Sequence, residues 1–213
     1  MTASSSTIAI LGAGNVGAAL ARNLARSGDR VYFGVPEPEK YAELAAGLGA
    51  RIGSVADAVA ASDIAILAVP YSAAIAIAGD IADWDGRILI DATNPLAPGL
   101  AGLSLGTTTS AAEEIAAKAN NARVVKAFNV TGAENMADPQ RLDGAVFMPV
   151  AADDADARAE VLALARRMGF DAVDAGPLKA ARYLEPFAMT WIHLAFAAGQ
   201  GRAWAFSRVR AAG

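Results

Sequence analysis

The chain has 213 residues, enough for about one to one and a half average domains with a sizeable buried core. It carries 22 acidic against 18 basic side chains, and its sequence shows no basic stripe of the kind that nucleic-acid-binding proteins use. With no cysteine and a single histidine, the composition excludes disulfides, thiol catalysis and cysteine- or histidine-rich metal sites. We therefore expect no metal site.

The mean hydropathy of +0.33 raises the question of a membrane span. The longest apolar run, residues 64–79, contains Pro70 and is shorter than the roughly 20 residues that cross a bilayer. The polar start MTASSST does not resemble a secretory signal. We expect a soluble, cytoplasmic protein that binds neither a membrane nor nucleic acid.

Predicted strands and helices alternate from the start of the chain. Residues 7–11 (TIAIL) form a buried strand, the glycine-rich turn 12–17 follows, an amphipathic helix ends at Gly28, and residues 31–35 form a second strand. Further along, the pattern predicts helices at 40–48, 54–61, 72–81, 111–119 and 156–168, and strands at 64–69, 87–91, 123–128, 144–148 and 171–174. Residues 93–109 form a loop, and the stretch 178–206 is helical with interruptions at Pro186 and around residues 199–201.

This alternation predicts an α/β protein with a doubly wound parallel sheet and a small, mainly helical C-terminal domain. We place the sheet domain at residues 1–150 and the C-terminal domain at residues 151–213. The helical stretch 183–198 is apolar on more than one side, so a single core cannot bury it all. We expect the C-terminal domain to close one side of a cleft and to contribute to a homodimer.

The turn after the first strand has the pattern Gly-x-Gly-x-x-Gly, formed by Gly12, Gly14 and Gly17. In such a turn the first glycine permits the tight bend, the second lets the backbone approach a pyrophosphate, and the third lets the helix pack closely on the strand. The free N–H groups of the helix start then face the phosphates. The context of strand, turn and helix favours a dinucleotide over a turn that binds no ligand.

The choice between NAD and NADP stays open from the residues alone. An NAD enzyme usually ends its second strand with an acidic residue, but Glu37 comes one or two positions late. An NADP enzyme places a cation there, and only Lys40 offers one, between Glu37 and Glu39.

Several segments of the chain, from Ile8 to about Arg208, resemble the NADP-dependent oxidoreductases of coenzyme F420. The segments are ILGAGNVG at 10–17, AVPY at 68–71, DATNPL at 91–96, SAAEEIA at 110–116, RVVKAFN at 123–129 and DAGPLKAARYLEP at 174–186.

The resemblance implies that residues 1–150 form a Rossmann-type dinucleotide-binding domain. It also implies hydride transfer between NADP, or NAD, and a small-molecule acceptor such as F420 or a flavin, with no catalytic residue supplied by the protein. Where the family often has Ser-Arg after the second strand, this chain has Val35-Pro36, and only Lys40 keeps its cationic place. The implied cofactor-binding residues are Gly12, Ala13, Gly14, Asn15, Val16 and Gly17 around the pyrophosphate; Val35 and Lys40 after the second strand; Val69, Pro70 and Tyr71 along the cofactor; and Asn94, Ala127 and Asn129 near the nicotinamide.

Two other functions stay open. On the same scaffold, a reductase of a small carbonyl or imine would need a proton donor, for which Lys126, Tyr71 and Tyr183 are the candidates. A dinucleotide-binding sensor without catalysis would keep the glycine turn but lose an open pocket beside the nicotinamide.

Some polar and aromatic residues have structural interpretations. His193 lies in an apolar segment and is expected in the core or an interface, and Lys126 could point to the cleft or to the sheet edge. Glu113 and Glu114 follow Ser110 in a helix-capping pattern. The aromatic residues near the C-terminus are expected as core or interface anchors, or as an apolar wall for a flat ring: Trp191, Phe196, Trp204 and Phe206.

Overall fold

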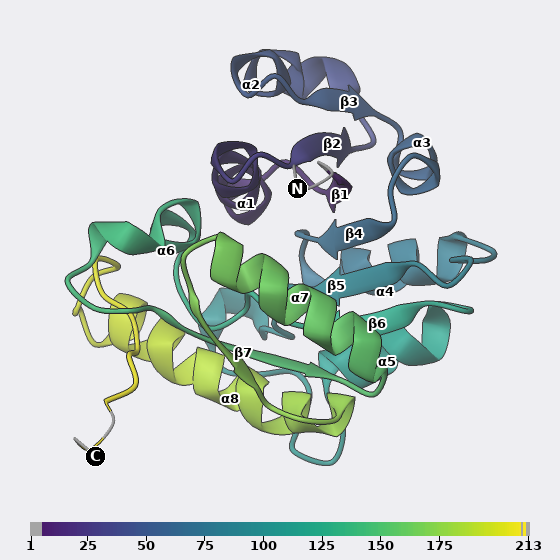
Figure 1. The fold of residues 1–213 in the computed structure, drawn as a ribbon. Helices are drawn as coiled ribbons and strands as arrows, with labels where there is room; N and C mark the ends of the chain where they lie inside the picture. Colours follow the sequence, from purple (N-terminus) through teal and green to yellow (C-terminus); the bar gives the residue numbers. More distant parts are fainter. Residues whose placement is uncertain (1–5, 210, 212–213) are drawn as a thin grey trace.

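The computed structural model describes residues 6–209 and 211, and its strands form one sheet in the order β3-β2-β1-β4-β5-β6-β7-β8 (Figure 1). All neighbouring strands are parallel except β6 and β7, which are antiparallel. The strands are β1 (Thr7–Leu11), β2 (Arg30–Gly34), β3 (Arg51–Gly53), β4 (Ile64–Leu67), β5 (Ile88–Asp91), β6 (Arg123–Lys126), β7 (Phe147–Ala152) and β8 (Asp171–Asp174). The first six follow the Rossmann order, which confirms the predicted fold class.

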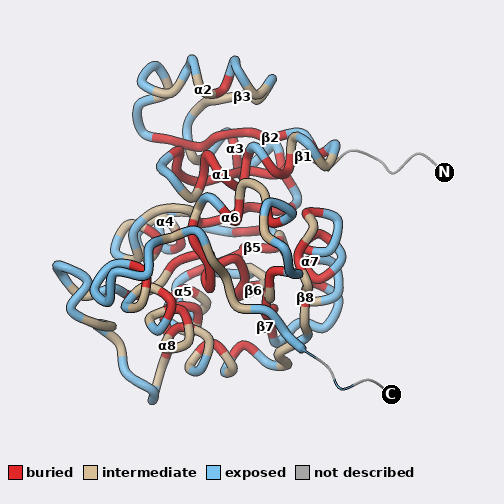
Figure 2. Tube along the Cα trace, turned by 90° about the vertical axis from the view of Figure 1, so that its left-hand side faces the viewer, coloured by how far each residue is buried: buried red, intermediate tan, exposed pale blue. Residues whose placement is uncertain are grey.

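Helices cover both faces of this sheet. The helices are α1 (Asn15–Arg26), α2 (Ala42–Gly47), α3 (Val55–Ala60), α4 (Tyr71–Asp80), α5 (Ala111–Lys118), α6 (Ala133–Ala137), α7 (Ala155–Arg167) and α8 (Ala181–Ile192). Ile8 and Ile10 of β1 pack toward α1 and α7, whereas Ala9 and Leu11 pack toward α3, α4 and α5. Because successive strand residues point to opposite faces, β1 needs apolar residues throughout, and Figure 2 shows the buried positions concentrated along the central strands.

The predicted strand at 144–148 is shifted, because β7 runs from Phe147 to Ala152 and contains Pro149. The Phe147 N–H donates to the Phe206 carbonyl, so the Pro149 nitrogen, two residues on, faces the same side, away from β8. On that side β7 pairs with β6 only at Ala151 and Ala152. Proline therefore costs no ladder hydrogen bond here.

Other boundaries also differ from the sequence prediction. Pro186 lies inside α8 and does not end it, although a proline removes one helical hydrogen bond. The helical stretch ends in a π-helical segment, His193–Ala197, and residues 199–208 are not helical. The helix predicted at 40–48 divides into a 3-10 turn and α2, and β3 and α6 were not predicted.

The predicted domain boundary at residue 150 falls inside β7. Since β7 pairs with both β6 and β8, residues 147–174 belong to the same sheet as the nucleotide-binding part. A helical C-terminal unit would begin after β8, and the division into two domains stays a prediction. Among the described residues, no helix has both the length and the apolar character for a membrane crossing.

Candidate functional site

Close contacts at Gly12 and Gly17 leave no room for a side chain at either position of the glycine turn. Gly12 has a φ of +110°, and its N–H donates to the Gly34 carbonyl at 3.0 Å. A Cβ on Gly12 would lie 2.6 Å from Val69 Cγ1, and one on Gly17 would lie 2.1 Å from the Gly12 carbonyl oxygen. These two glycines therefore hold β1, the turn and α1 together.

Gly14 is different, because an added Cβ would meet no atom within 4 Å. It is exposed, it precedes the first residue of α1, and no side chain caps that helix or places an acidic group in its first turn. The N–H groups at the start of α1 are therefore open to an outside acceptor. An exposed glycine before uncapped N–H groups fits the pyrophosphate of a dinucleotide.

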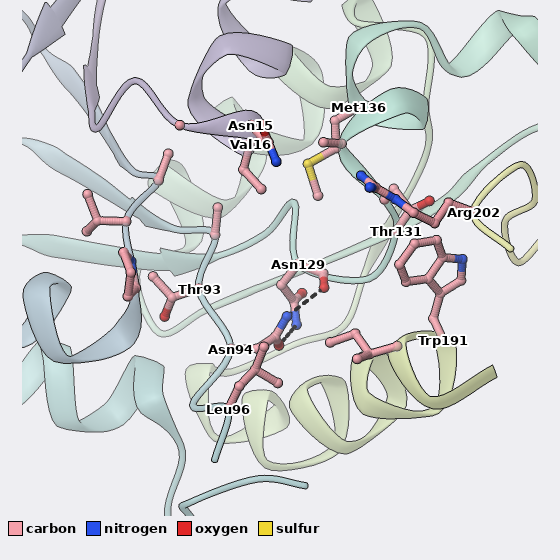
Figure 3. A pocket seen from close by; sticks show the side chains of 18 of the residues that line it. Asn15, Val16, Thr93, Asn94, Leu96, Asn129, Thr131, Met136, Trp191 and Arg202 are labelled. Atoms are coloured by element: carbon pink, nitrogen blue, oxygen red, sulfur yellow. Dashed lines mark hydrogen bonds between the residues drawn. The ribbon is translucent and has the colours of Figure 1, made fainter. Parts of the chain in front are cut away.

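A cavity of about 550 Å³ opens beside this turn, at the carboxyl ends of β4, β5 and β6 (Figure 3). In an open α/β sheet, ligands bind at this edge. The far wall consists of α6, the end of α8 and the C-terminal strap, the name used here for residues 199–208. The lining residues are Gly14, Asn15, Val16, Ala68, Val69, Pro70, Ala92, Thr93, Asn94, Leu96, Leu100, Asn129, Thr131, Gly132, Ala133, Met136, Trp191, Ile192, Phe196 and Arg202.

A second cavity, of about 480 Å³, lies on the other side of Gly12, between the end of β2 and helices α3 and α4. Val69 lines both cavities, so one extended ligand can run past the glycine turn from one to the other. The second lining is mostly apolar, includes the Asp80 carboxylate and has no lysine or arginine: Gly12, Gly34, Pro36, Val55, Ala56, Val69, Ala73, Ala76, Ile77, Asp80 and Ile81. It suits a flat adenine ring better than a phosphate.

Two asparagines form a polar pair in the first cavity. The Asn94 side-chain amide donates to the Asn129 carbonyl at 2.9 Å, and the Asn129 amide donates to Asn94 Oδ1 at 3.0 Å (Figure 3). Phe128, buried with a φ of +58°, turns the chain after β6 just before Asn129. A bulky residue in the left-handed region is strained, and such strain is concentrated at functional sites.

Three buried polar atoms of the lining have no hydrogen-bond partner within the described residues: Thr93 Oγ1, Asn129 Oδ1 and Arg202 Nε. A buried donor or acceptor without a partner costs about 1–3 kcal/mol. Their convergence on one cavity indicates that a polar ligand completes them. A nicotinamide carboxamide, with one acceptor and one donor group, matches Thr93 and Asn129.

Lys126 neither lines the cavity nor reaches the sheet edge. Its Nζ lies 2.8 Å from Asp91 Oδ2, 2.9 Å from Glu185 Oε1 and 2.6 Å from the Thr93 carbonyl oxygen, and the Lys126 side chain is fully buried. Glu185 also accepts the backbone N–H groups of Ala111 and Ala112. The lysine thus ties the end of β5 to α5 and α8, from behind the pocket.

The predicted site residues divide into three groups. Seven line the first cavity: Gly14, Asn15, Val16, Val69, Pro70, Asn94 and Asn129. Gly12 lines the second cavity, whereas Ala13, Gly17, Val35, Lys40, Tyr71 and Ala127 line neither. Val35 and Ala127 are buried in the core, and Lys40 is exposed beside Tyr41. Burial, and next the Glu114 carboxylate, raises the pKa of the Tyr71 hydroxyl.

Sequence reasoning missed several residues of the far wall. Thr131, Met136 and Arg202 carried no recognised spacing, since only the fold brings them to the cavity. Glu185, which binds Lys126 behind the pocket, lies in the 174–186 segment of the resemblance but was given no role from the sequence. Trp191 lines the cavity, as the aromatic-wall interpretation proposed. His193 is exposed, so the expected core position is wrong, and an interface position stays a prediction. Ser110 caps α5 as predicted, and Glu113 also binds Arg182.

Comparison with known proteins places this geometry in a family. The family described as NADP oxidoreductase, coenzyme F420-dependent, matches residues 7–95. The F420-dependent NADP reductase of Methanothermobacter marburgensis is 32% identical over 207 residues, covering 88% of this chain and 91% of that protein. The chain belongs to the coenzyme F420-dependent NADP oxidoreductase family.

Two further relatives support the assignment. A crystal structure of a candidate F420-dependent NADP-reductase from Arthrobacter sp. FB24 superimposes with a TM-score of 0.88 at 29% identity, covering 96% of this chain and all of that one. Rat metalloreductase STEAP3 is 33% identical over 181 residues. The match covers 84% of this chain, which spans only 35% of the length of STEAP3.

Proposed function

We propose that this F420-dependent NADP oxidoreductase family member transfers a hydride between NADPH and coenzyme F420, or a similar flavin-like acceptor. The observation that carries the proposal is the first cavity. It lies beside an open glycine turn, has an aromatic far wall, and contains unpartnered polar atoms that a nicotinamide and a second ring would complete.

The chain's own residues bind, orient and exclude water. The start of α1 binds the pyrophosphate, and the Asn94–Asn129 pair and the Thr93 hydroxyl orient the nicotinamide. Trp191 and Ile192 exclude water from the far side of the cavity. When bound, the nicotinamide supplies the hydride chemistry itself, so the protein's contribution is stacking geometry.

The lining disfavours a carbonyl or imine reductase. Within the lining, Arg202 is the one residue with an ionisable side chain, and arginine stays protonated. Of the three candidate proton donors, Lys126 is saturated by three acceptors, Tyr183 is exposed, and Tyr71 lies outside the lining. The open cavity also disfavours a sensor without turnover, which would have no use for the space beside the nicotinamide.

The experiment that tests this function incubates the purified protein with NADPH and one acceptor at a time. F420, FMN, and a panel of small ketones and imines are compared by following NADPH oxidation. We expect fast oxidation with F420, slower oxidation with FMN, and none above background with the panel. Oxidation by a ketone or imine and not by F420 would contradict the proposal.

We also propose a homodimer formed through the outer face of α8. Tyr183 on this face is 72% exposed, and Leu184, Phe187 and Met189 are only partly buried. Exposed apolar patches of this kind mark interfaces. Light scattering should give twice the chain mass of 21.7 kDa, and Tyr183→Lys should shift it toward the monomer. A single-chain mass for the unmodified protein would refute the dimer.

The remaining assignments are proposals of the same kind. The six predicted residues outside both cavities would affect cofactor binding indirectly, because they support the glycine turn and the ends of the strands that contact the cofactor. A cytoplasmic location is proposed because both substrates are small soluble cofactors, and fractionation of the native cells would test it.

A further inference from the structure

Among the residues that the structure describes, the lining of the first cavity contains a single charged side chain, that of Arg202 in the C-terminal strap. The other lining residues are apolar or neutral. In such a cleft the one fixed charge dominates the attraction of an acidic ligand group. Figure 3 shows the Arg202 side chain reaching from the strap toward Met136 and Thr131, on the far side of the cavity from Asn15 and Val16.

Contacts hold this guanidinium in place before any ligand arrives. Its Nη2 lies 2.7 Å from Glu134 Oε1, and the group lies 5.6 Å from the centre of the Phe196 ring. Two residues on, the Trp204 carbonyl accepts hydrogen bonds from Asn135 at 2.8 Å and from Trp191 at 3.1 Å. The strap is thereby fixed to α6 and α8, and Arg202 with it.

One donor of this oriented group is unused. Arg202 Nε is buried and has no partner among the described residues, although the rest of the side chain is partly exposed. Glu134 takes the Nη2 group, and arginine has five N–H donors in a planar fork. Because the Arg202 side chain is 39% exposed, donors other than the Nη2 group are available to an acceptor oxygen in the cavity.

We infer that Arg202 is a specificity-determining residue for the hydride acceptor, and that it donates to a carbonyl oxygen of a flat heteroaromatic ring or to an oxygen of its phosphate group. The inference rests on the proposed function, since it assigns the acceptor to the cavity half opposite the glycine turn. Flavins and deazaflavins present carbonyl oxygens along one ring edge, and FMN adds a phosphate that riboflavin lacks.

The test compares Arg202→Met, Arg202→Lys and Glu134→Gln with the unmodified protein. Dissociation constants for F420, FMN and riboflavin are measured by the fluorescence of each acceptor in the presence of NADP⁺, with NADPH affinity as the check on folding. Arg202→Met should weaken flavin binding about tenfold or more, as for a lost hydrogen bond to a charged group, and leave NADPH affinity unchanged. Arg202→Lys should restore part of the loss.

Glu134→Gln is the matched control, because it breaks the same ion pair but keeps the arginine. It should bind flavin as tightly as the unmodified protein or more tightly. If Arg202→Met and Glu134→Gln lose flavin affinity equally, Arg202 serves only to hold the C-terminal strap in place, and the inference is wrong. Equal losses for FMN and riboflavin place the contact on the ring, whereas a loss confined to FMN places it on the phosphate.

The readout separates this inference from the proposed function. An unmodified protein that binds flavins but reduces neither F420 nor a flavin would refute the proposed function, while the affinities would still report on Arg202. Unchanged flavin affinity in Arg202→Met, or no binding of FMN, riboflavin or F420 by the unmodified protein, would overturn the inference.

Discussion

The two walls of the first cavity are built in different ways. The glycine-turn wall is made by residues close together in the chain, from Gly12 to Gly17, and the close approach of Gly17 to the Gly12 carbonyl lies within one strand–turn–helix unit. The far wall is assembled from α6, α8 and the C-terminal strap, and it is held by side chains such as Glu185 and Arg202. The first wall is a local property of the sequence, and the second exists only in the folded chain.

The largest expected effect concerns the buried charges behind the far wall. Lys126→Met would leave the Asp91 and Glu185 carboxylates buried without their shared cation. Removing one partner of a buried ion pair costs about 3–5 kcal/mol of unfolding free energy. Urea denaturation measures the loss, and Arg182→Met, which breaks the more exposed pair with Glu113, should cost much less. Equal losses of unfolding free energy in the two variants would show that the Lys126 cluster stabilises the fold no more than the Arg182–Glu113 pair does.

A substitution in the glycine-turn wall should lower the affinity for NADPH without lowering the stability of the fold. Gly14→Val has open space for its side chain and an ordinary φ of −73°, so the variant should fold. The new side chain would occupy the pyrophosphate position and weaken NADPH binding by about 3 kcal/mol or more, roughly a hundredfold. NADPH fluorescence titration measures it, with Gly47→Val as a control at another open glycine. Unchanged NADPH affinity would contradict the placement of the pyrophosphate.

A smaller effect is expected at the far end of the dinucleotide. The second cavity has no cation in its lining, and Lys40 is an exposed side chain outside it. One exposed cation contributes about 1 kcal/mol or less, so we expect NADPH to be preferred over NADH by less than about tenfold. Ratios of kcat/KM for the two coenzymes measure this preference. A ratio above about a hundredfold would reveal a phosphate site that the lining residues do not show.

The smallest effect is a pH dependence at the N-terminus of α5. The hydrogen bond from Arg182, and next that from Ser110, holds the pKa of Glu113 below its usual value of 4.5. A lowered pKa in the folded state adds stability above the unfolded pKa, and that stability is lost as the pH falls through the folded value. Glu113→Gln should therefore flatten the acid side of the plot of Tm against pH. An unchanged slope would mean that the pair adds no stability.

The same contrast explains what the sequence could predict. The alternation of strand and helix patterns predicted the doubly wound sheet, and the spacing of Gly12, Gly14 and Gly17 predicted the nucleotide turn. Both patterns are readable because each is contained in a short segment of the chain. The strand β7 was predicted to end before Pro149, because a proline cannot donate a hydrogen bond within a sheet. The proline is tolerated because β6 pairs with β7 only at Ala151 and Ala152, which the sequence does not show. Lys126 stayed ambiguous because Glu185 lies 59 residues away in the chain and meets it only through α8.

The far wall was the least predictable part for the same reason. No sequence motif around Arg202 predicts a functional role for it. That role is inferred from its ion pair with Glu134 and from its unpartnered Nε, which only the folded structure shows. The family resemblance pointed to Asn94 and Asn129, which do form a pair in the cavity. Thr93 lies in the same segment as Asn94 but was given no role, although it lines the cavity and its buried hydroxyl has no partner among the described residues.

The most direct test of the account follows a deuterium label from the nicotinamide to the acceptor. The purified protein is given F420 and NADPH deuterated at the reactive nicotinamide carbon, in ordinary water, and the reduced F420 is analysed by mass spectrometry. Because a hydride that passes directly from the nicotinamide carbon to the acceptor ring does not exchange with water, the account predicts that the label is retained in the product. Loss of the label to water, or no reduction of F420, would contradict direct transfer between two rings held in this cavity.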